Sequence, residues 1–195
     1  MPLEIELKMR LEYPEALEAR LKALGANRRG PVMEQNTYYD TSAADLRRAG
    51  QGLRLRIEHP TEGGPPRAIV THKGPRAPGP LKTRQETQVQ VSDSGQAAEL
   101  LEALGYRPVL FFEKRRRRWQ LDDCSVEIDS LPYIEDYVEI EGPNEQAVLA
   151  ARVRIEMDKV PLVKKSYLGL LREYLEKQGM SVTRVTFADA KQERE

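Results

Sequence analysis

Residues 3–11 alternate strictly between apolar and charged side chains, and this pattern constrains the fold more than any other feature of the chain. A period of two residues is typical of a β-strand, in which successive side chains point to opposite faces. The apolar positions are Leu3, Ile5, Leu7 and Met9, and the charged positions are Glu4, Glu6, Lys8 and Arg10. One face of this strand therefore packs on a hydrophobic core, and the other has to meet solvent or a polar interior.

Several further segments also have the strand pattern, and in each of them the charged or polar residues lie on one face. They are Arg54/Arg56/Glu58, Arg84/Glu86/Gln88, Lys114/Arg116, Glu127/Asp129 and Glu139/Glu141. The residues alone leave two interpretations open. In the first, an antiparallel sheet exposes a solvated outer face, which is the better explanation for any single strand. In the second, a closed barrel of about eight strands holds the charges inside, with paired carboxylates for a hard cation and arginines for phosphate oxygens.

Strand patterns, turns and helical patterns divide the chain into short elements. The predicted strands cover residues 3–11, 32–39, 52–59, 67–73, 81–91, 109–121, 125–131 and 134–141. The predicted helices cover residues 14–24, 93–104, 145–154 and 164–177. Because most strands follow one another through short turns, we expect an α+β protein built on an antiparallel sheet or barrel. We expect a single domain over residues 1–180, and a C-terminal extension over 181–195 that frays over 188–195.

Composition excludes several classes of protein. The 195 residues contain 31 Lys and Arg balanced by 31 Asp and Glu, and this zero net charge argues against a nucleic-acid protein that binds through a bulk positive field. Cys124 is the single cysteine, and there are two histidines, so we expect no disulfide or zinc site, and any metal should be a hard, oxygen-bound ion. Neither a membrane span nor a signal peptide is evident, so we expect a cytoplasmic protein.

Eight short motifs follow one another in order along the chain. They are Glu4-x-Glu6-x-Lys8, QNTYYDT at 35–41, GLRLRIE at 52–58, THKG at 71–74, RQE at 84–86, EKRRRRW at 113–119, EIDSLPYIEDYVEIEG at 127–142 and KSYLGLL at 165–171. Together they resemble the signature of the CYTH domain family, the triphosphate tunnel metalloenzymes, which include class IV adenylate cyclases, thiamine triphosphatases and inorganic triphosphatases. The resemblance implies an eight-stranded antiparallel β-barrel that forms a tunnel, with helices packed on the outside.

The same resemblance implies the residues of a site. The metal ligands would be Glu4, Glu6, Glu139 and Glu141, with Glu86 and Asp129 as further ligands or supporting groups. The triphosphate would be bound by Lys8, Arg54, Arg56, Lys73, Arg84, Lys114, Arg116 and Lys165. Lys8, Glu4 and Glu6 would form the catalytic group, in which Lys8 orients the nucleophile. The implied cofactor is Mg²⁺ or Mn²⁺, and the cations would neutralise the roughly four negative charges of a triphosphate.

Two positions leave details of this site open. Gln88 stands where many family members have a second Glu after Arg-x-Glu, so a second metal ion is in question. The basic run Arg115–Arg118 admits two registers, because one face of the strand offers Lys114, Arg116 and Arg118 and the other offers Arg115, Arg117 and Trp119. The spacing found in the family favours Lys114 and Arg116.

Three functions are compatible with this pattern. The preferred one is hydrolysis, in which metal-activated water attacks the terminal phosphorus of inorganic triphosphate, thiamine triphosphate or a nucleoside triphosphate. The second is class IV adenylate cyclase activity, in which the ribose 3′-oxygen of ATP attacks its own α-phosphorus and releases pyrophosphate. The third is a non-catalytic module that binds polyphosphate or a nucleotide. We expect a small-molecule triphosphate as partner, no membrane or nucleic acid, and a monomer or homodimer.

Overall fold

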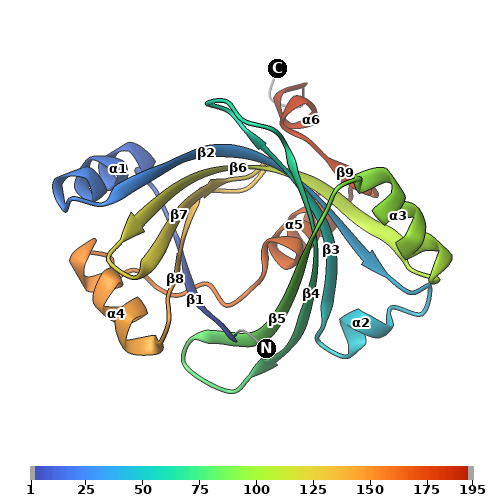
Figure 1. Ribbon diagram of the computed structural model, residues 1–195, viewed down its shortest axis with the longest axis horizontal. Coiled ribbons are helices and arrows are strands. Elements are labelled where there is room, and N and C mark those ends of the chain that lie inside the picture. Colours follow the sequence, from blue (N-terminus) through green and yellow to red (C-terminus); the bar gives the residue numbers. More distant parts are fainter. Residues whose placement is uncertain (1–2, 193–195) are drawn as a thin grey trace.

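Eight β-strands close into a barrel in the computed structural model, which describes residues 3–192 (Figure 1). The strands are β1 (Leu3–Arg10), β2 (Asn27–Asp40), β3 (Gly52–Pro60), β4 (Arg67–Ala77), β5 (Lys82–Val91), β6 (Arg107–Leu121), β7 (Cys124–Ser130) and β8 (Tyr137–Glu141). Around the barrel they lie in the order β2, β3, β4, β5, β1, β8, β7, β6, and β6 pairs with β2 to complete the ring. Every neighbouring pair in the ring is antiparallel. The predicted eight-stranded antiparallel barrel is confirmed.

The two longest strands, β2 and β6, form the seam that closes the ring. Backbone pairing along this seam runs from Asn27 to Asp40 of β2, and its register shifts in two places. Such bulges bend a strand and increase its twist, which helps a sheet to curl into a barrel. Closure pairs the backbone groups that an open sheet would leave at its two edges. A two-residue strand, β9 (Arg184–Val185), adds to β6 in parallel.

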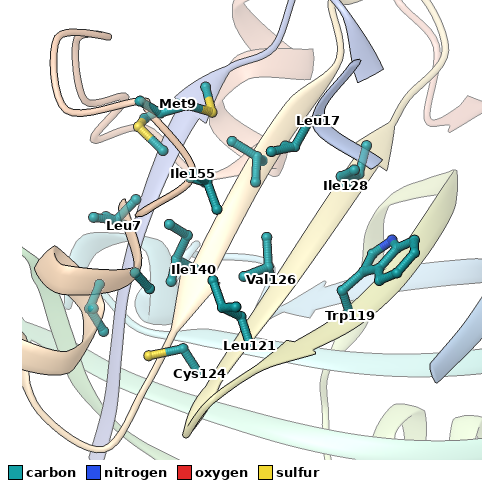
Figure 2. Close-up of a cluster of buried hydrophobic side chains, with 14 of the residues drawn as sticks. Leu7, Met9, Leu17, Trp119, Leu121, Cys124, Val126, Ile128, Ile140 and Ile155 are labelled. Carbon is teal, nitrogen blue, oxygen red and sulfur yellow. The ribbon is translucent and has the colours of Figure 1, made fainter. Parts of the chain in front are cut away.

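Two helices, α1 (Pro14–Ala23) and α4 (Glu145–Arg154), cover the apolar outer face of β1, β7 and β8. Figure 2 shows Leu7, Val126 and Ile140 in this core, where all three side chains are almost fully buried. Burial of apolar surface, at roughly 25 cal/mol per Å², holds the helices on the barrel. Because the apolar residues of these strands face the helices, the charged residues that alternate with them face the inside of the barrel.

Helix α3 (Ser94–Ala103) covers another part of the outer wall. Its Leu101 packs with Leu53 and Leu55 of β3. The helix begins after Asp93, whose carboxylate accepts hydrogen bonds from two backbone N–H groups of the first turn. This cap explains why the sequence pattern located the helix well.

Helix α5 (Tyr167–Lys177) closes one end of the barrel instead of covering its side. Its Leu171 is fully buried in a cluster with Leu110 and Phe112, which lie on the inward face of β6. Figure 1 shows the helix inside the outline of the ring of strands. A short helix, α2 (Asp45–Arg48), follows β2 and lines the same cavity as α5. We call this the α2–α5 end of the barrel.

Several boundaries differ from those predicted. Strand β2 begins at Asn27 rather than at residue 32. Strand β8 begins at Tyr137 rather than at residue 134, because Tyr133 adopts a left-handed backbone conformation (φ 67°) in the preceding turn. Helix α5 begins at Tyr167 rather than at residue 164, because the Ser166 side chain caps it by accepting a hydrogen bond from a backbone N–H group.

The C-terminal segment is more ordered than the sequence indicated. Phe187–Gln192 form helix α6, and the side chains of Thr186 and Asp189 each accept a hydrogen bond from the other's backbone N–H group at its start. The expected fraying over 188–195 is therefore wrong for residues 188–192, and residues 193–195 lie outside the described residues. The domain division at residue 180 stays a prediction. None of the helices within residues 3–192 is long and apolar enough to cross a membrane.

Candidate active site

A cavity of about 1050 Å³ lies inside the barrel, and we call it the tunnel cavity. All eight barrel strands contribute side chains to its lining, and α5 contributes at one end. Most of these side chains are charged, because they occupy the inward positions of strands whose other face is apolar. The charged faces recognised in the sequence therefore line an interior, and their interpretation as a solvated outer surface is wrong.

The pairing register sets inward charges of neighbouring strands side by side. Glu4 of β1 lies opposite Arg84 of β5, and Lys8 of β1 lies opposite Glu139 of β8. Between them, Glu6 is paired with both neighbouring strands. Directly opposed residues are close enough for their side chains to interact. Positive and negative groups are thus interleaved along the tunnel cavity.

Glu34 lies at the centre of a group of cations on β3 and β6, which we call the positively charged wall. It is fully buried, and its carboxylate oxygens lie 3.1 Å from Arg56 Nη1, 3.1 Å from Lys114 Nζ and 3.6 Å from Arg116 Nε. Burial alone would raise the pKa of Glu34, but these cations lower it well below its usual range. Lys114 and Arg116 therefore face inward, as the family spacing favoured, and Glu34 anchors the cations that surround it.

Asp129 is a second buried anchor beneath the cavity wall. It accepts hydrogen bonds from Lys114 Nζ at 3.2 Å, from Arg116 Nε at 2.7 Å and from the Tyr167 hydroxyl at 2.8 Å. Asp129 is fully buried and is not among the described residues that line the cavity. Of its two predicted roles, these contacts suit a supporting group better than a metal ligand.

Arg116 connects the two anchors with the carboxylates of the tunnel cavity. Its Nη2 lies 2.7 Å from Glu139 Oε2, and its Nη1 forms an ion pair with Glu127. Burial opposes the charge of Arg116, but Asp129, Glu127 and Glu34 raise its pKa well above the usual value. The guanidinium is therefore permanently charged and held in place by four carboxylates.

Lys73 and Lys82 together hold three of the carboxylates that were predicted as metal ligands. Lys73 Nζ lies 2.8 Å from Glu4 Oε1 and 2.6 Å from Glu86 Oε2, and Lys82 forms an ion pair with Glu6. Against the effect of burial, the two ammonium groups lower the pKa of Glu4 to about 2. In this arrangement, no group of three or more His, Cys, Asp or Glu side chains within residues 3–192 is gathered closely enough to hold a metal ion.

Two observations nevertheless indicate that these carboxylates are incompletely satisfied in the ligand-free chain. Glu4 Oε2 is buried and accepts no hydrogen bond from any described residue, and Arg84 Nε lies 3.8 Å from it, within ion-pair range but beyond hydrogen-bond distance. Partial burial, together with the negative charges of Glu127, Glu4 and Glu86, raises the pKa of Glu141 to about 7. Mg²⁺ and Mn²⁺ prefer carboxylate oxygens as ligands. The donor set therefore fits a hard divalent cation.

Lys8 is fixed from three sides where β1 meets the segment before α5. Its Nζ donates a hydrogen bond to the backbone carbonyl oxygen of Lys165 at 3.0 Å and lies 3.4 Å from Glu139 Oε1. The same atom lies 3.6 Å from the centre of the Tyr167 ring. Burial lowers the pKa of Lys8, while Glu139 and Asp129 oppose this effect. The ammonium group is held rigidly at the cavity surface.

The tunnel cavity brings together all predicted site residues except Asp129. Those that line it are Glu4, Glu6, Lys8, Arg54, Arg56, Lys73, Arg84, Glu86, Lys114, Arg116, Glu139, Glu141 and Lys165. Lys165 differs from the others, because its side chain is more than half exposed and lies 2.5 Å from Glu173 of α5. Gln88, the departure from the family pattern, donates a hydrogen bond to Glu86.

Four residues of the site were not among the predicted site residues: Glu34, Lys82, Glu127 and Tyr167. Glu34 precedes Asn36 by two residues, and Lys82 precedes Arg84 by two, so the same alternation of side chains could have found both. Tyr167 reaches Asp129 only because α5 enters the end of the barrel, a contact between residues far apart in sequence that no local pattern encodes.

A closed antiparallel barrel of eight strands with a charged interior is the triphosphate tunnel fold, and this defines the class of the protein. A family model, the CYTH domain, matches residues 2–167. The chain therefore belongs to the CYTH family.

Known proteins resemble the chain over most of its length. Adenylate cyclase CyaB of Aeromonas hydrophila is 35% identical over 142 residues, which cover 70% of this chain and 67% of that protein. The structure of PH1819 from Pyrococcus horikoshii has a TM-score of 0.76 at 24% identity and covers 87% of this chain and 98% of its own. HpAC1 from Hippeastrum, named as a candidate adenylyl cyclase with a dominant triphosphatase activity, has a TM-score of 0.67 at 18% identity and covers 92% and 97%.

Proposed function

We propose that this protein hydrolyses a linear triphosphate with the help of a divalent cation, Mg²⁺ or Mn²⁺. The observation that carries the proposal is that cations and carboxylates line one cavity inside the barrel. The cations include Lys8, Arg54, Arg56, Lys73, Lys82, Arg84, Lys114 and Arg116, and the carboxylates include Glu4, Glu6, Glu86, Glu127, Glu139 and Glu141. These two sets pair with each other in the ligand-free chain, and a polyanion with a bound metal ion offers a partner of opposite charge to both, which a neutral ligand does not.

The basic residues of the cavity would bind and orient the phosphate chain. Guanidinium groups form paired hydrogen bonds with phosphate oxygens, and Arg56 is already positioned by Glu34. Because Glu34 and Asp129 fix Lys114 and Arg116 before a ligand arrives, little reorganisation is needed as charge moves toward the leaving group. Positive charge held in this way favours the transition state over the bound substrate.

The carboxylates on the opposite side would hold the cation. Glu4, Glu6, Glu139 and Glu141 would be its ligands, with Glu86 as a further one, and a bound divalent ion supplies Lewis acidity and lowers the pKa of water. Lys73 and Lys82 neutralise these carboxylates in the ligand-free chain. With these carboxylates holding a cation, Lys73 and Lys82 would be free to contact the phosphates. Lys8, fixed between Glu139 and Tyr167, would orient the attacking water.

Adenylate cyclase activity is the second candidate, and the 35% identity with a protein named adenylate cyclase favours it. Cyclisation would use the same cavity but would place the α-phosphorus, rather than the terminal one, next to the nucleophile. The structural resemblance to HpAC1, which is named for a dominant triphosphatase activity, supports hydrolysis. Hydrolysis also needs only contacts with phosphate, whereas cyclisation requires a ribose held in a defined position.

A product assay on the purified protein tests these alternatives. Inorganic triphosphate, thiamine triphosphate and ATP are supplied separately with Mg²⁺ or Mn²⁺, and phosphate, pyrophosphate and cyclic AMP are resolved. We expect phosphate from at least one substrate and no cyclic AMP. Cyclic AMP with stoichiometric pyrophosphate would establish the cyclase. Absence of turnover with every substrate would favour the third candidate, a module that only binds polyphosphate or a nucleotide.

Two substitutions locate the activity in the tunnel cavity. We expect Glu4→Gln and Glu139→Gln to reduce turnover by about 100-fold, because loss of metal-site groups costs about 10- to 100-fold or more. Glu99→Gln is the matched control, since Glu99 lies exposed on α3. Normal turnover in both site variants would place the chemistry elsewhere. A collapse of turnover with triphosphate still bound would separate catalysis from binding.

A further inference from the structure

Two arginines at the α2–α5 end of the tunnel cavity stand outside its network of ion pairs. Arg47 of α2 and Arg172 of α5 both line the cavity. Their neighbour Arg48 lies 2.5 Å from Asp45 on the same helix. Among the described residues, by contrast, no carboxylate is in salt-bridge contact with either Arg47 or Arg172. These two guanidiniums are therefore available to a ligand that enters at this end.

Three acidic residues, Asp40, Glu173 and Glu176, line the same end of the cavity, but none of them forms a salt bridge with either arginine. Burial and the positive charge of Arg47 lower the pKa of Arg172, and Asp40 and Glu176 oppose this only in part. The Asp40 carboxylate is already occupied, because it accepts three hydrogen bonds of 2.8 to 3.1 Å from backbone N–H groups at the start of α2. The two guanidiniums thus line a shared space in which the carboxylates of Asp40 and Glu173 are engaged by other groups.

We propose that Arg47 and Arg172 form a second anion subsite, which binds a phosphoryl group beyond the three held inside the barrel. The chain would then prefer linear substrates with four or more phosphates. This inference rests on the proposed function, because it extends the same cavity. An anion relieves the repulsion between two guanidiniums, which a neutral base does not, and the guanidinium fork matches phosphate oxygens.

The size of the cavity is consistent with a longer ligand. Its volume of about 1050 Å³ lies at the upper limit of ordinary small-molecule pockets, which hold ligands in roughly 300–1,000 Å³. The phosphate-binding residues of the barrel wall and the Arg47–Arg172 pair belong to this one continuous space. A phosphate chain can therefore extend from the barrel to the α2–α5 end without leaving it.

The test compares the binding of inorganic triphosphate and inorganic tetraphosphate by calorimetry. Each ligand is titrated in EDTA, and again with Mg²⁺ in the slow Glu4→Gln background, so that turnover does not contribute. We expect tetraphosphate to bind at least about tenfold more tightly than triphosphate, because a hydrogen bond to a charged group is worth about 1.5–3 kcal/mol. The Arg47→Gln/Arg172→Gln variant should lose this preference while its affinity for triphosphate changes by less than about threefold.

Arg48→Gln is the matched control, because it removes the same charge from the same helix at a residue that is paired with Asp45. This variant should keep the preference for tetraphosphate. Adenosine 5′-tetraphosphate and ATP are titrated in parallel. If adenosine 5′-tetraphosphate exceeds ATP in affinity by the same factor as tetraphosphate exceeds triphosphate, the result supports the subsite and extends it to nucleotides.

Other results would overturn the inference. Equal affinity for triphosphate and tetraphosphate in the unmodified chain would remove the subsite and leave the proposed function intact. If the double variant lost affinity for triphosphate and tetraphosphate equally, the arginines would contribute only a general positive field and no subsite. A loss confined to ATP would indicate stacking on the base instead of phosphate binding. Failure of every ligand to bind would overturn both this inference and the proposed function.

Discussion

At the scale of single residues, Tyr167 supports two groups of the site, Asp129 and Lys8, without being a predicted ligand itself. Its hydroxyl donates to Asp129 at 2.8 Å, and its ring lies 3.6 Å from Lys8 Nζ. We expect Tyr167→Phe to lose about 1.5–3 kcal/mol of unfolding free energy, because a buried carboxylate loses one donor. Tyr167→Leu also removes the ring, so turnover should fall further in this variant as Lys8 loses a contact that positions it.

Urea unfolding and the separate values of kcat and KM distinguish these effects. The control is Tyr174→Phe, which removes the same hydroxyl group from the same helix. The ring of Tyr174 stacks on Tyr133 at a centroid distance of 5.5 Å. We expect kcat to decrease in the order of native protein, Tyr167→Phe and Tyr167→Leu. Equal kcat in the two Tyr167 variants would mean that the ring does not position Lys8.

At the scale of elements, the connection between β8 and α4 depends on a residue without a side chain. A Cβ at Gly142 would lie 2.7 Å from Cys124 Sγ and 3.0 Å from Val148 Cγ2. Figure 2 shows Cys124 in the core beneath the helices. We expect Gly142→Ala to destabilise the fold by about 1–3 kcal/mol, the usual cost of overpacking. Removing the sulfur with Cys124→Ala should recover part of that loss.

The free energies of unfolding of the two single variants and the double variant, measured in urea, form a double-mutant cycle. The double variant should be more stable than the sum of the two single effects predicts. Strict additivity would show that the helix moves away from the strand instead of meeting the sulfur atom.

Most of these elements could be predicted from the sequence, and the exceptions share a physical cause. Alternation and caps located the eight barrel strands and the longer helices, because those signals are local. Helix α2 escaped prediction because it starts after Ala44, which has a positive φ of 57°, and its first turn is held by the Asp40 carboxylate instead of a cap of its own. Strand β9 exists only through its contact with β6.

At the scale of the whole molecule, the alternation of charge could not distinguish a closed barrel from an open sheet. The distinction depends on the pairing of β2 with β6, which joins residues far apart in sequence. The resemblance to a family supplied what the local pattern lacked. The choice of ion-pair partners, such as Lys73 with both Glu4 and Glu86, depends on the register of the closed ring in the same way. Most site residues were therefore predictable, but their partners were not.

The interior charges also give the whole molecule a characteristic pH dependence. Lys73 and Lys82 lower the pKa of Glu4 to about 2, so its contribution to stability is present above pH 4.5 and is lost as the pH falls toward 2. Glu141 acts in the opposite direction, because its pKa rises from 4.5 to about 7. Between these two values the unfolded chain binds fewer protons at Glu141 than the folded chain does, so stability falls as the pH rises.

We therefore expect Glu141→Gln to flatten the decrease in melting temperature between pH 5 and pH 8 in EDTA, because the glutamine cannot ionise. Glu141 is partly exposed, so solvent screens its repulsion from Glu127 and the difference should be modest. Adding Mg²⁺ should raise the melting temperature of the native protein more at pH 8 than at pH 5, since the cation competes with protons for the same oxygens. Glu99→Gln should change neither slope. A Mg²⁺ effect that is independent of pH, or one that persists undiminished in Glu141→Gln, would remove Glu141 from the metal site and leave the charged barrel itself unaffected.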